Sequence, residues 1–564
     1  MNDFISSATS GNWKRLNTDS SLRLQKRANK RKSEKKIIPL EYFSDSKNIT
    51  DLNALIDRIN LENWSIDSVI YSLCINMLKN ANLTEKNHVK KVIENYDFEI
   101  IPELLEYKIP DNERDFLGLV YQSLLTEGEK NIQGSYYTPQ KITDNMVSDF
   151  DFSSGEKYFD PCCGSGSFIL SLKAENPEQI FGIDKDFIAV LIAKVNLLLK
   201  YNEKIFEPRI ICADYLNNLK NDYSEILFDY VASNPPWGAK IKSGETFSYF
   251  FVKSFEQLKS NGIIRFLFPE SILRVKTHRN IRKFFLESGS IESITSYEGN
   301  FTGVMTRYVS ISLSKKSQNK NFIYKSNDSE QIINISSIYK YGTENLIFNF
   351  LNSYDLKIFE LFNSKGKYSL KNSVWALGIV TGDNKKKLLK EFSEGSEEIF
   401  TGREITPYLL RPAKNYIFYD RKNFQQIAND EIYRAPEKLV YKFISNKLVF
   451  AYDDRQKLFL NSANILIPNI PGMSTKTVMA FLNSELYQFI YKKIFGEVKI
   501  LQGNLTELLF PEIERSEDKI ISVLVNEILK NENINEIHSK IQDIIYEIFG
   551  ITNKQKIYIR KILS

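Results

Sequence analysis

The feature that most constrains the fold of this chain is a polar loop that directly follows an apolar strand. The segment 228–232 (FDYVA) predicts a short strand, and Ser233-Asn234-Pro235-Pro236-Trp237-Gly238 follows it. The prolines end the strand because they have no N–H to donate to a sheet. The loop presents a side-chain amide, carbonyls beside the prolines and an indole face, which together can hold an exocyclic amine and stack on its ring. A plain turn is the alternative for the loop taken alone.

A glycine-rich turn lies upstream of this loop. Residues 158–168 (YFDPCCGSGSF) and the apolar run 169–172 indicate a strand end, a tight turn and the start of a helix. This arrangement is typical of sites that receive a nucleotide-like cofactor at a helix N-terminus. Gly164 and Gly166 permit the turn and a close approach of the backbone, and Ser167 can cap the helix. An ordinary turn remains the alternative for this motif alone.

Two further strand-like segments end in acidic residues. Residues 179–184 end in Asp184, at the spacing where nucleotide-binding folds hold ribose hydroxyls, and residues 209–214 end in Asp214, which could accept from an adenine amino group. Each acid alone is better explained as a solvated cap. Three successive strand ends with polar groups nevertheless predict one site at one edge of a sheet. The alternation of strands and helices over 131–315 predicts an α/β fold with a mostly parallel sheet.

These motifs, in this order, resemble the gamma-class N6-adenine DNA methyltransferases of restriction–modification systems. The pattern begins at Gly134-Ser135-Tyr136-Tyr137-Thr138-Pro139 and ends at the Asn-Pro-Pro-Trp loop. The resemblance implies a Rossmann-like domain that transfers a methyl group from S-adenosylmethionine to N6 of an adenine flipped out of double-stranded DNA. It places the cofactor contacts on Tyr137, Thr138, Pro139, Asp160, Cys162, Gly164, Gly166, Asp184, Lys185, Asp214, Tyr215 and Asn234. The catalytic residues that it implies are Asn234, Pro235, Pro236 and Trp237.

The sequence departs from the family pattern at two places. Trp237 stands where Tyr or Phe is commoner, and its larger face should still stack on the target base. Cys162 and Cys163 stand where small or aliphatic residues are usual, which leaves the shape of the pocket open. Phe301 matches the family's second stacking position for the target base, and a buried strand phenylalanine explains it equally well.

The resemblance continues into the C-terminal half. Residues 375–384 (WALGIVTGDN) look like the entry to the target-recognition domain of single-chain family members. Further matching motifs follow in order at 402–405 (GREI), 450–453 (FAYD), 482–484 (LNS) and 496–501 (GEVKIL). Basic residues alternate with aromatics here, which suits phosphate contacts beside base stacking, although the whole chain is rich in both. From Asp518 onward the apolar spacing predicts two amphipathic helices.

The chain of 564 residues is long enough for about two to four domains. The expected division is a flexible basic tail over 1–40, a helical domain over 41–130, the methyltransferase domain over 131–320, a connecting segment over 321–365, a mixed α+β target-recognition domain over 366–512 and C-terminal helices over 513–564. The tail's charge run either stays solvated or contacts the DNA backbone, and both interpretations stay open.

Composition excludes several other classes. A net charge of +5 provides no strong global field, so any basic surface must be local. The four cysteines form no disulfide framework and the three histidines form no Cys/His cluster, which argues against a zinc or histidine-based hydrolytic centre and favours a reducing cytosol. No apolar run approaches about twenty residues, and the N-terminus lacks a signal sequence. We therefore expect a cytoplasmic protein with no metal and no membrane partner.

Parts of the sequence also fit three rival functions. A methyltransferase of an RNA base or of a protein glutamine amide would also use an Asn-Pro-Pro loop, because each substrate presents an sp² nitrogen, but such enzymes do not usually carry a long recognition domain. The intact loop and glycine turn disfavour an inactive DNA-binding scaffold. A fused nuclease in residues 1–110 has only Glu106-Tyr107-Lys108 after Asp97 in its favour. Any cognate restriction endonuclease is therefore expected on a separate chain.

Overall fold

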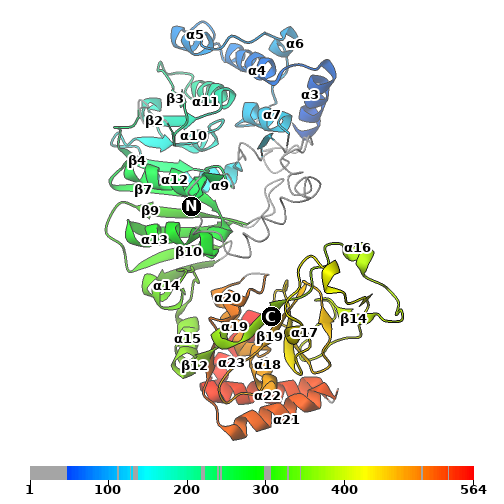
Figure 1. Ribbon diagram of the computed structural model, residues 1–564. Coiled ribbons are helices and arrows are strands. Elements are labelled where there is room, and N and C mark those ends of the chain that lie inside the picture. Colours follow the sequence, from blue (N-terminus) through cyan, green and yellow to red (C-terminus); the bar gives the residue numbers. More distant parts are fainter. Residues whose placement is uncertain are drawn as a thin grey trace. The chain divides into compact units, whose positions relative to one another are not determined.

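A computed structural model of the chain divides it into two compact units (Figure 1). It describes residues 48–110, 113–126, 129–130, 138–217, 223–237, 240–241, 244–297, 307–326, 329–342, 344–496, 499–530 and 533–564. The first unit extends to Leu273 and includes Asn280–Ile332, and the second contains Arg274–Arg279 and Ile333–Ser564. The predicted tail over 1–40, Tyr137 and Phe301 lie outside the described residues.

The first unit is built on a nine-stranded sheet of order β11-β10-β8-β9-β7-β4-β1-β2-β3. The strands are β1 (Tyr158–Asp160), β2 (Ile180–Asp184), β3 (Arg209–Cys212), β4 (Phe228–Ser233), β7 (Leu258–Pro269), β8 (Ser290–Tyr297), β9 (Tyr308–Ser314), β10 (Asn321–Ser326) and β11 (Ser329–Asn334). From β3 through β7 all pairs are parallel, whereas β9 runs antiparallel to both β7 and β8. The carboxyl ends of β1, β2, β3 and β4 therefore meet at one edge, as the sequence predicts.

Helices and short elements connect the strands of the first unit. They are α9 (Gln140–Val147), α10 (Ser167–Ser171), η3 (Pro177–Gln179), α11 (Phe187–Lys200), β5 (Lys240–Ile241), β6 (Gly244–Glu245), α12 (Thr246–Glu256), η4 (Glu270–Leu273), η5 (Lys276–His278) and α13 (Arg279–Glu287). Helix α11 packs on β2 and β3, and α12 packs on β7. The Asp186 carboxylate accepts from the N–H groups of Ile188 and Ala189 and so caps α11 at the carboxyl end of β2. The expected Rossmann-like α/β fold is confirmed.

The N-terminal helices share one hydrophobic core with this sheet. They are α3 (Asn48–Glu62), α4 (Ile66–Asn80), α5 (Asn87–Ile93), α6 (Pro102–Leu105) and α7 (Phe116–Leu124). Leu73 and Leu117 belong to the same buried cluster as Tyr158 of β1 and Leu191 of α11. The segment expected as a separate helical domain is thus packed as part of the methyltransferase fold. The sheet also continues to Asn334, past the boundary expected at residue 320.

The second unit has a helical part and a β-rich part. The helical part contains α14 (Ile335–Tyr341), α15 (Ser353–Lys365), α18 (Thr475–Leu482), α19 (Glu485–Ile494), α20 (Gln502–Leu505), α21 (Arg515–Leu529), α22 (Ile534–Phe549), α23 (Asn553–Leu563) and the paired strands β12 (Gly366–Ser369) and β20 (Leu509–Pro511). Its core includes Phe362 of α15, which stacks on Phe549 of α22 with ring centroids 5.2 Å apart. The sequence predicts two helices at this end. The third, α23, begins at the Thr552–Gln555 capping box and buries only Ile559, so its apolar pattern is weak.

The β-rich part has a core of its own, which includes Ile379, Ile399, Val440 and Ile465. Its sheets are β13 (Val374–Leu377), β19 (Ala463–Ile467), β16 (Lys438–Lys442) and β17 (Phe450–Asp453) in that order, and β15 (Tyr416–Ile417), β14 (Glu397–Phe400) and β18 (Leu458–Phe459). The short helices are η6 (Leu370–Asn372), α16 (Asn384–Lys387), η7 (Arg421–Asn423) and α17 (Asp430–Tyr433). Leu439 and Leu466 of β16 and β19 belong to the helical core, whereas their neighbours Val440 and Ile465 belong to the β-rich core, so these two strands contribute to both cores of the second unit.

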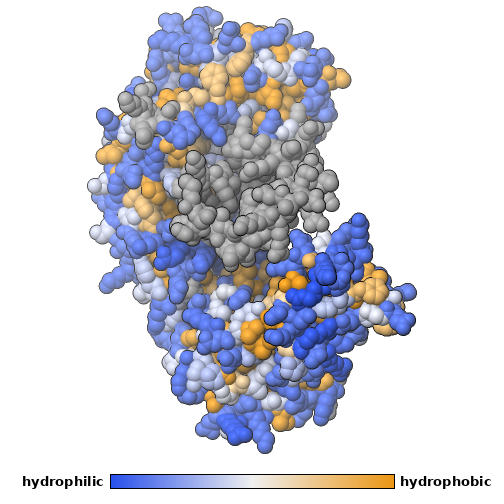
Figure 2. All heavy atoms as spheres, in the orientation of Figure 1, coloured by the Kyte–Doolittle hydropathy of each residue, from blue (hydrophilic) through white to orange (hydrophobic). Residues whose placement is uncertain are grey.

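The surface is mainly hydrophilic, with scattered apolar side chains, on the face that Figure 2 shows. Among the helices of the described part of the chain, none is long and apolar enough to span a membrane.

Candidate active site

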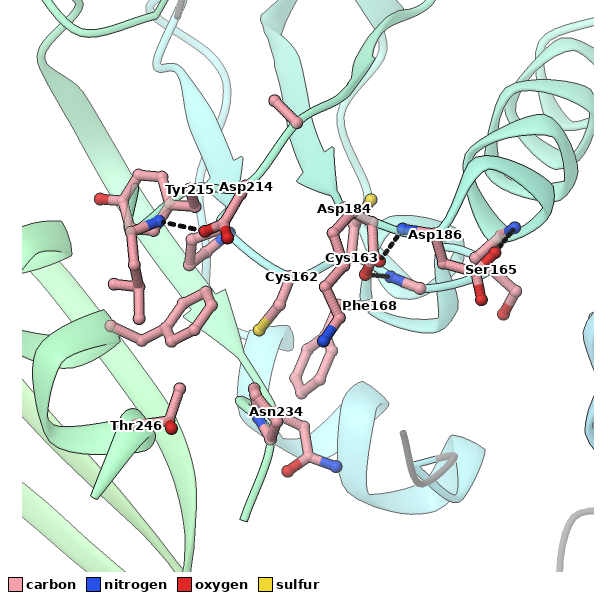
Figure 3. Close-up of a pocket in the computed structure, with 18 of the residues that line it drawn as sticks. Cys162, Cys163, Ser165, Phe168, Asp184, Asp186, Asp214, Tyr215, Asn234 and Thr246 are labelled. Carbon is pink, nitrogen blue, oxygen red and sulfur yellow. Dashed lines mark hydrogen bonds between the residues drawn. The ribbon is translucent and has the colours of Figure 1, made fainter. Parts of the chain in front are cut away.

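A cavity of about 470 Å³ opens where the ends of β1 to β4 meet (Figure 3). Its wall includes the glycine turn after β1, the acidic ends of β2 and β3 and the loop after β4. The predicted site residues that line it are Thr138, Cys162, Gly164, Asp184, Lys185, Asp214, Tyr215, Asn234 and Pro236. Segments far apart in the sequence are thus brought to one cavity, as strand-end positions predict.

Five predicted site residues do not line the cavity: Pro139, Asp160, Gly166, Pro235 and Trp237. Asp160 is buried in the sheet and turns toward β4. Gly166 serves the turn itself, because its φ of 91° is one that side chains disfavour. The indole of Trp237 packs against the core, and its Nε1–H donates to the Leu267 carbonyl over 3.2 Å.

Asp184 holds the glycine turn in place. Its Oδ2 accepts from the Gly164 N–H over 2.8 Å, and its Oδ1 accepts from the Asp186 N–H over 2.9 Å. Burial raises the pKa of this carboxyl, and the two backbone hydrogen bonds oppose that rise. Because each carboxylate oxygen has a second lone pair, Asp184 can still accept from a ligand hydroxyl.

Asp214 caps the turn that follows β3. Its Oδ1 accepts from the N–H groups of Leu216 and Asn217, and its Oδ2 accepts from Asn217 Nδ2 over 2.7 Å. Burial raises the pKa of Asp214, but these hydrogen bonds outweigh it and the net pKa lies below the ordinary value. The cavity therefore has an ionised carboxylate at this end.

Asn234 is oriented by a residue from another predicted motif. Its Nδ2 donates to Thr138 Oγ1 over 3.1 Å, and the Thr138 side chain is buried. Because the amide nitrogen donates to Thr138, the amide oxygen is directed away from Thr138, and its chemistry is that of a hydrogen-bond acceptor. The Thr-Pro motif and the Asn-Pro-Pro loop thus form one structural element of the cavity.

Several cavity-lining residues were not predicted as site residues. Tyr121 and Gln122 come from α7, and the Tyr121 hydroxyl donates to Asp186 Oδ2 over 2.7 Å. Aromatic walls come from Phe168 of α10 and Phe250 of α12. The others are Pro161, Cys163, Ser165, Ser167, Asp186, Ala189, Ala213, Leu216, Asn217, Thr246, Tyr249 and Lys253. The sequence signal for this helix is the apolar run over 117–125 (LGLVYQSLL), which leads into the methyltransferase domain.

Comparison with known proteins gives two family matches. Residues 112–373 match the model described as N-6 DNA Methylase, and residues 397–509 match the TaqI-like C-terminal specificity domain. The Type II methyltransferase M.VspI of Vibrio sp. (strain 343) is 26% identical over 410 residues, which are 63% of this chain and 98% of that protein. The Type I restriction enzyme EcoEI methylase subunit of Escherichia coli is 25% identical over 47% of this chain and 58% of its own length.

A solved structure shares the fold across almost the whole chain. The Type IIL restriction-modification enzyme MmeI, determined in complex with DNA, superposes with a TM-score of 0.58 at 13% identity and covers 93% of this chain and 94% of its own. The match to the N-6 DNA Methylase model favours DNA over RNA or a protein amide as the substrate. The chain belongs to the N6-adenine DNA methyltransferases of restriction–modification systems, in the single-chain form with a C-terminal specificity domain.

Proposed function

We propose that the cavity binds S-adenosylmethionine and that Asn234 presents N6 of a flipped-out adenine to it. The observation that supports this is the convergence of the glycine turn, Asp184, Asp214 and Asn234 on one cavity. S-adenosylmethionine, when bound, supplies an electrophilic methyl group on a cationic sulfonium. A cavity of about 470 Å³ with ionisable carboxylates at two strand ends and aromatic walls has the size and chemistry for such a ligand.

Each of these residues contacts a different part of the cofactor in this proposal. Asp184 is placed to accept from ribose hydroxyls, and Asp214 to accept from the adenine amino group, with Phe168 and Phe250 as apolar walls. The open backbone at Gly164, with its positive φ of 53°, lets the cofactor approach the turn closely. Lys185 and Tyr215 complete the same wall. Tyr137 of the Gly134–Pro139 motif stays a predicted contact outside the described residues.

Catalysis depends on the geometry of the target nitrogen. The lone pair of adenine N6 is delocalised into the ring, so the amine is a poor nucleophile. Hydrogen bonds from both N–H groups to Asn234 Oδ1 and the Pro235 carbonyl favour a more tetrahedral nitrogen whose lone pair points at the methyl group. The protein therefore acts by positioning and preorganised dipoles rather than through a strong base. Trp237 is proposed to stack on the extruded base, and Phe301 stays a predicted second stacking residue.

The substitution Asn234→Ala tests the division of roles. We expect it to lower the methyl-transfer rate by roughly 10²–10³ while the calorimetric affinity for S-adenosylmethionine stays nearly unchanged, because Asn234 acts on the target amine. Asp184→Ala is the matched variant, and it should weaken cofactor binding first. A fall in cofactor affinity that parallels the loss of activity in Asn234→Ala would contradict this assignment, and an unchanged affinity in Asp184→Ala would remove Asp184 from the site.

The remaining proposals concern partners. We propose that residues 366–512 recognise the target site in double-stranded DNA and that any cognate endonuclease is a separate chain. The free cysteines Cys74, Cys162, Cys163 and Cys212 suit the reducing cytoplasm, where we place the protein.

A further inference from the structure

A buried polar network joins the ends of β1 and β4. Ser233 Oγ donates to Asp160 Oδ1 over 2.5 Å, and the Cys162 N–H donates to the same oxygen over 3.1 Å. The Cys162 sulfur lies 2.9 Å from Ser233 Oγ. Because the Ser233 proton is directed to Asp160, the thiol is the donor in that contact, and burial raises the pKa of the thiol so that it keeps its proton. The network is a chain from thiol to hydroxyl to carboxyl.

This acid is costly to bury. Asp160 is 1% exposed and Ser233 is fully buried. Among the described residues, Asp160 Oδ2 has no hydrogen-bond partner. Burial raises the pKa of Asp160 to about 7, with the hydrogen bonds from Ser233 and Cys162 opposing the rise and Asp184 adding to it. The strands are already joined by the sheet ladder and by the Tyr158 hydroxyl, which donates to the Ala232 carbonyl over 2.9 Å. A well-packed apolar pair would join them at lower cost, so a role beyond packing is indicated.

The network connects the glycine turn, on the cofactor side of the cavity, to the catalytic loop that contains Asn234. Asp160 is the residue from which the glycine turn departs, and Ser233 immediately precedes Asn234. Cys162, two residues after Asp160, and Asn234, directly after Ser233, both line the cavity (Figure 3). One hydrogen bond between residues 73 positions apart therefore ties the cofactor side of the cavity to the catalytic loop.

We propose that Asp160 is a positioning residue that acts through Ser233 to fix Asn234 relative to the glycine turn, and that it does not contact the cofactor. The inference rests on the proposed roles of that turn and of Asn234. Catalysis by positioning is sensitive to small displacements, since a shift of about 1 Å can cost about 10²-fold in rate. Loss of the link should consequently change the transfer step and leave cofactor binding intact.

The first test is Ser233→Ala, assayed in the full-length protein. We expect the single-turnover rate of methyl transfer from radiolabelled S-adenosylmethionine to DNA to fall about 10- to 100-fold. Calorimetric affinity for S-adenosylhomocysteine should stay within about threefold of wild type, since the cofactor wall is untouched. Ser312→Ala is the matched control, because Ser312 is also a buried serine of this sheet and accepts from Arg265 Nε over 3.1 Å. Ser312→Ala should lower the melting temperature about as much as Ser233→Ala does and leave the rate of methyl transfer unchanged.

The second test is a double-mutant cycle with Asp160→Asn. If Asp160 acts through Ser233, the variant carrying both changes should be no slower than Ser233→Ala alone. Losses that multiply, or a Ser233→Ala rate within about twofold of wild type, would overturn the inference. The result for Asn234→Ala separates the two proposals. If that variant is inactive while Ser233→Ala is normal, only the positioning role fails, and an active Asn234→Ala variant would defeat the proposed function itself.

Discussion

At the scale of single residues, the buried carboxyl of Asp160 makes stability depend on pH. Its pKa rises from the usual 3.8 to about 7 on folding. A raised pKa means that its contribution to stability is fully present below pH 3.8 and is lost as the pH rises through about 7, a change of roughly 4 kcal/mol.

The variant Asp160→Asn has no such charge to bury. We predict that it raises the melting temperature relative to wild type more at pH 8 than at pH 5, even though it slows methyl transfer. Thermal denaturation of both proteins at the two pH values measures this. An equal difference at both pH values would show that folding does not raise the pKa of Asp160.

Sequence reasoning found the residues whose place in the cavity depends on local motifs. Gly164, Asp184 and Asn234 lie at the carboxyl ends of strands or shortly after them, and the carboxyl ends of neighbouring parallel strands meet at one edge of the sheet. It did not find Gln122 or Phe250, because helix packing brings them to the cavity. The sequence also did not predict which way the Asp160 side chain points. It shows that an acid ends β1, but not that this acid accepts a hydrogen bond from Ser233.

At the scale of elements, the segment 401–411 is a hydrogen-bonded turn that carries two exposed arginines. Glu404 is buried, and its Oε2 accepts from the Thr401 N–H and hydroxyl over 2.8 and 2.6 Å. The Arg411 N–H donates to the Glu404 carbonyl, which places the two chain segments side by side. Arg403 and Arg411 are exposed, and their guanidinium groups have no ion pair within the described chain. They are available for DNA phosphates.

We predict that Arg403→Ala and Arg411→Ala each lower the slope of log affinity for DNA against log salt by about 1. Arg421 supplies the matched control, because it is also exposed in this part of the chain but already pairs with Asp430. Arg421→Ala should leave the slope unchanged. Fluorescence anisotropy with target DNA at several salt concentrations makes the comparison, and an equal effect of all three changes would contradict it.

Two strands at one end of the large sheet were not predicted from the sequence. β11 (SEQIIN) is the edge strand at one end of the sheet and β10 (NFIYKS) is its neighbour, and both are polar and partly exposed. Edge strands bury little side-chain area, so their sequences show no clear apolar alternation, and the segment was expected to be a connection. The strands β1, β2 and β4 inside the sheet contain apolar runs, and the sequence predicts each of them, whereas the more polar β8 (SIESITSY) was not predicted.

At the scale of the whole molecule, the boundary between the units decides how the chain can be divided. Helix α15 buries Ile358, Phe359 and Phe362 in the second unit, so a cut at Lys365 would expose them. A chain that ends at Asn334 keeps all nine strands. We predict that it binds S-adenosylmethionine but no longer methylates DNA at a defined sequence. Calorimetry and single-molecule sequencing of methylated DNA test this, and methylation at the same sequence as full-length protein would place recognition elsewhere.

The two separate cores of the second unit have an evolutionary consequence. The β-rich core around Ile379 and Val440 shares no buried residue with the helical core around Phe362 and Phe549. Mutations confined to the β-rich core can therefore accumulate while the first unit, which carries Asn234, stays unchanged. Leu439 and Leu466 of β16 and β19 belong instead to the helical core, so changes there would also affect the helices. Related enzymes can therefore inherit the same catalytic unit while they diverge in the DNA sequences that they methylate.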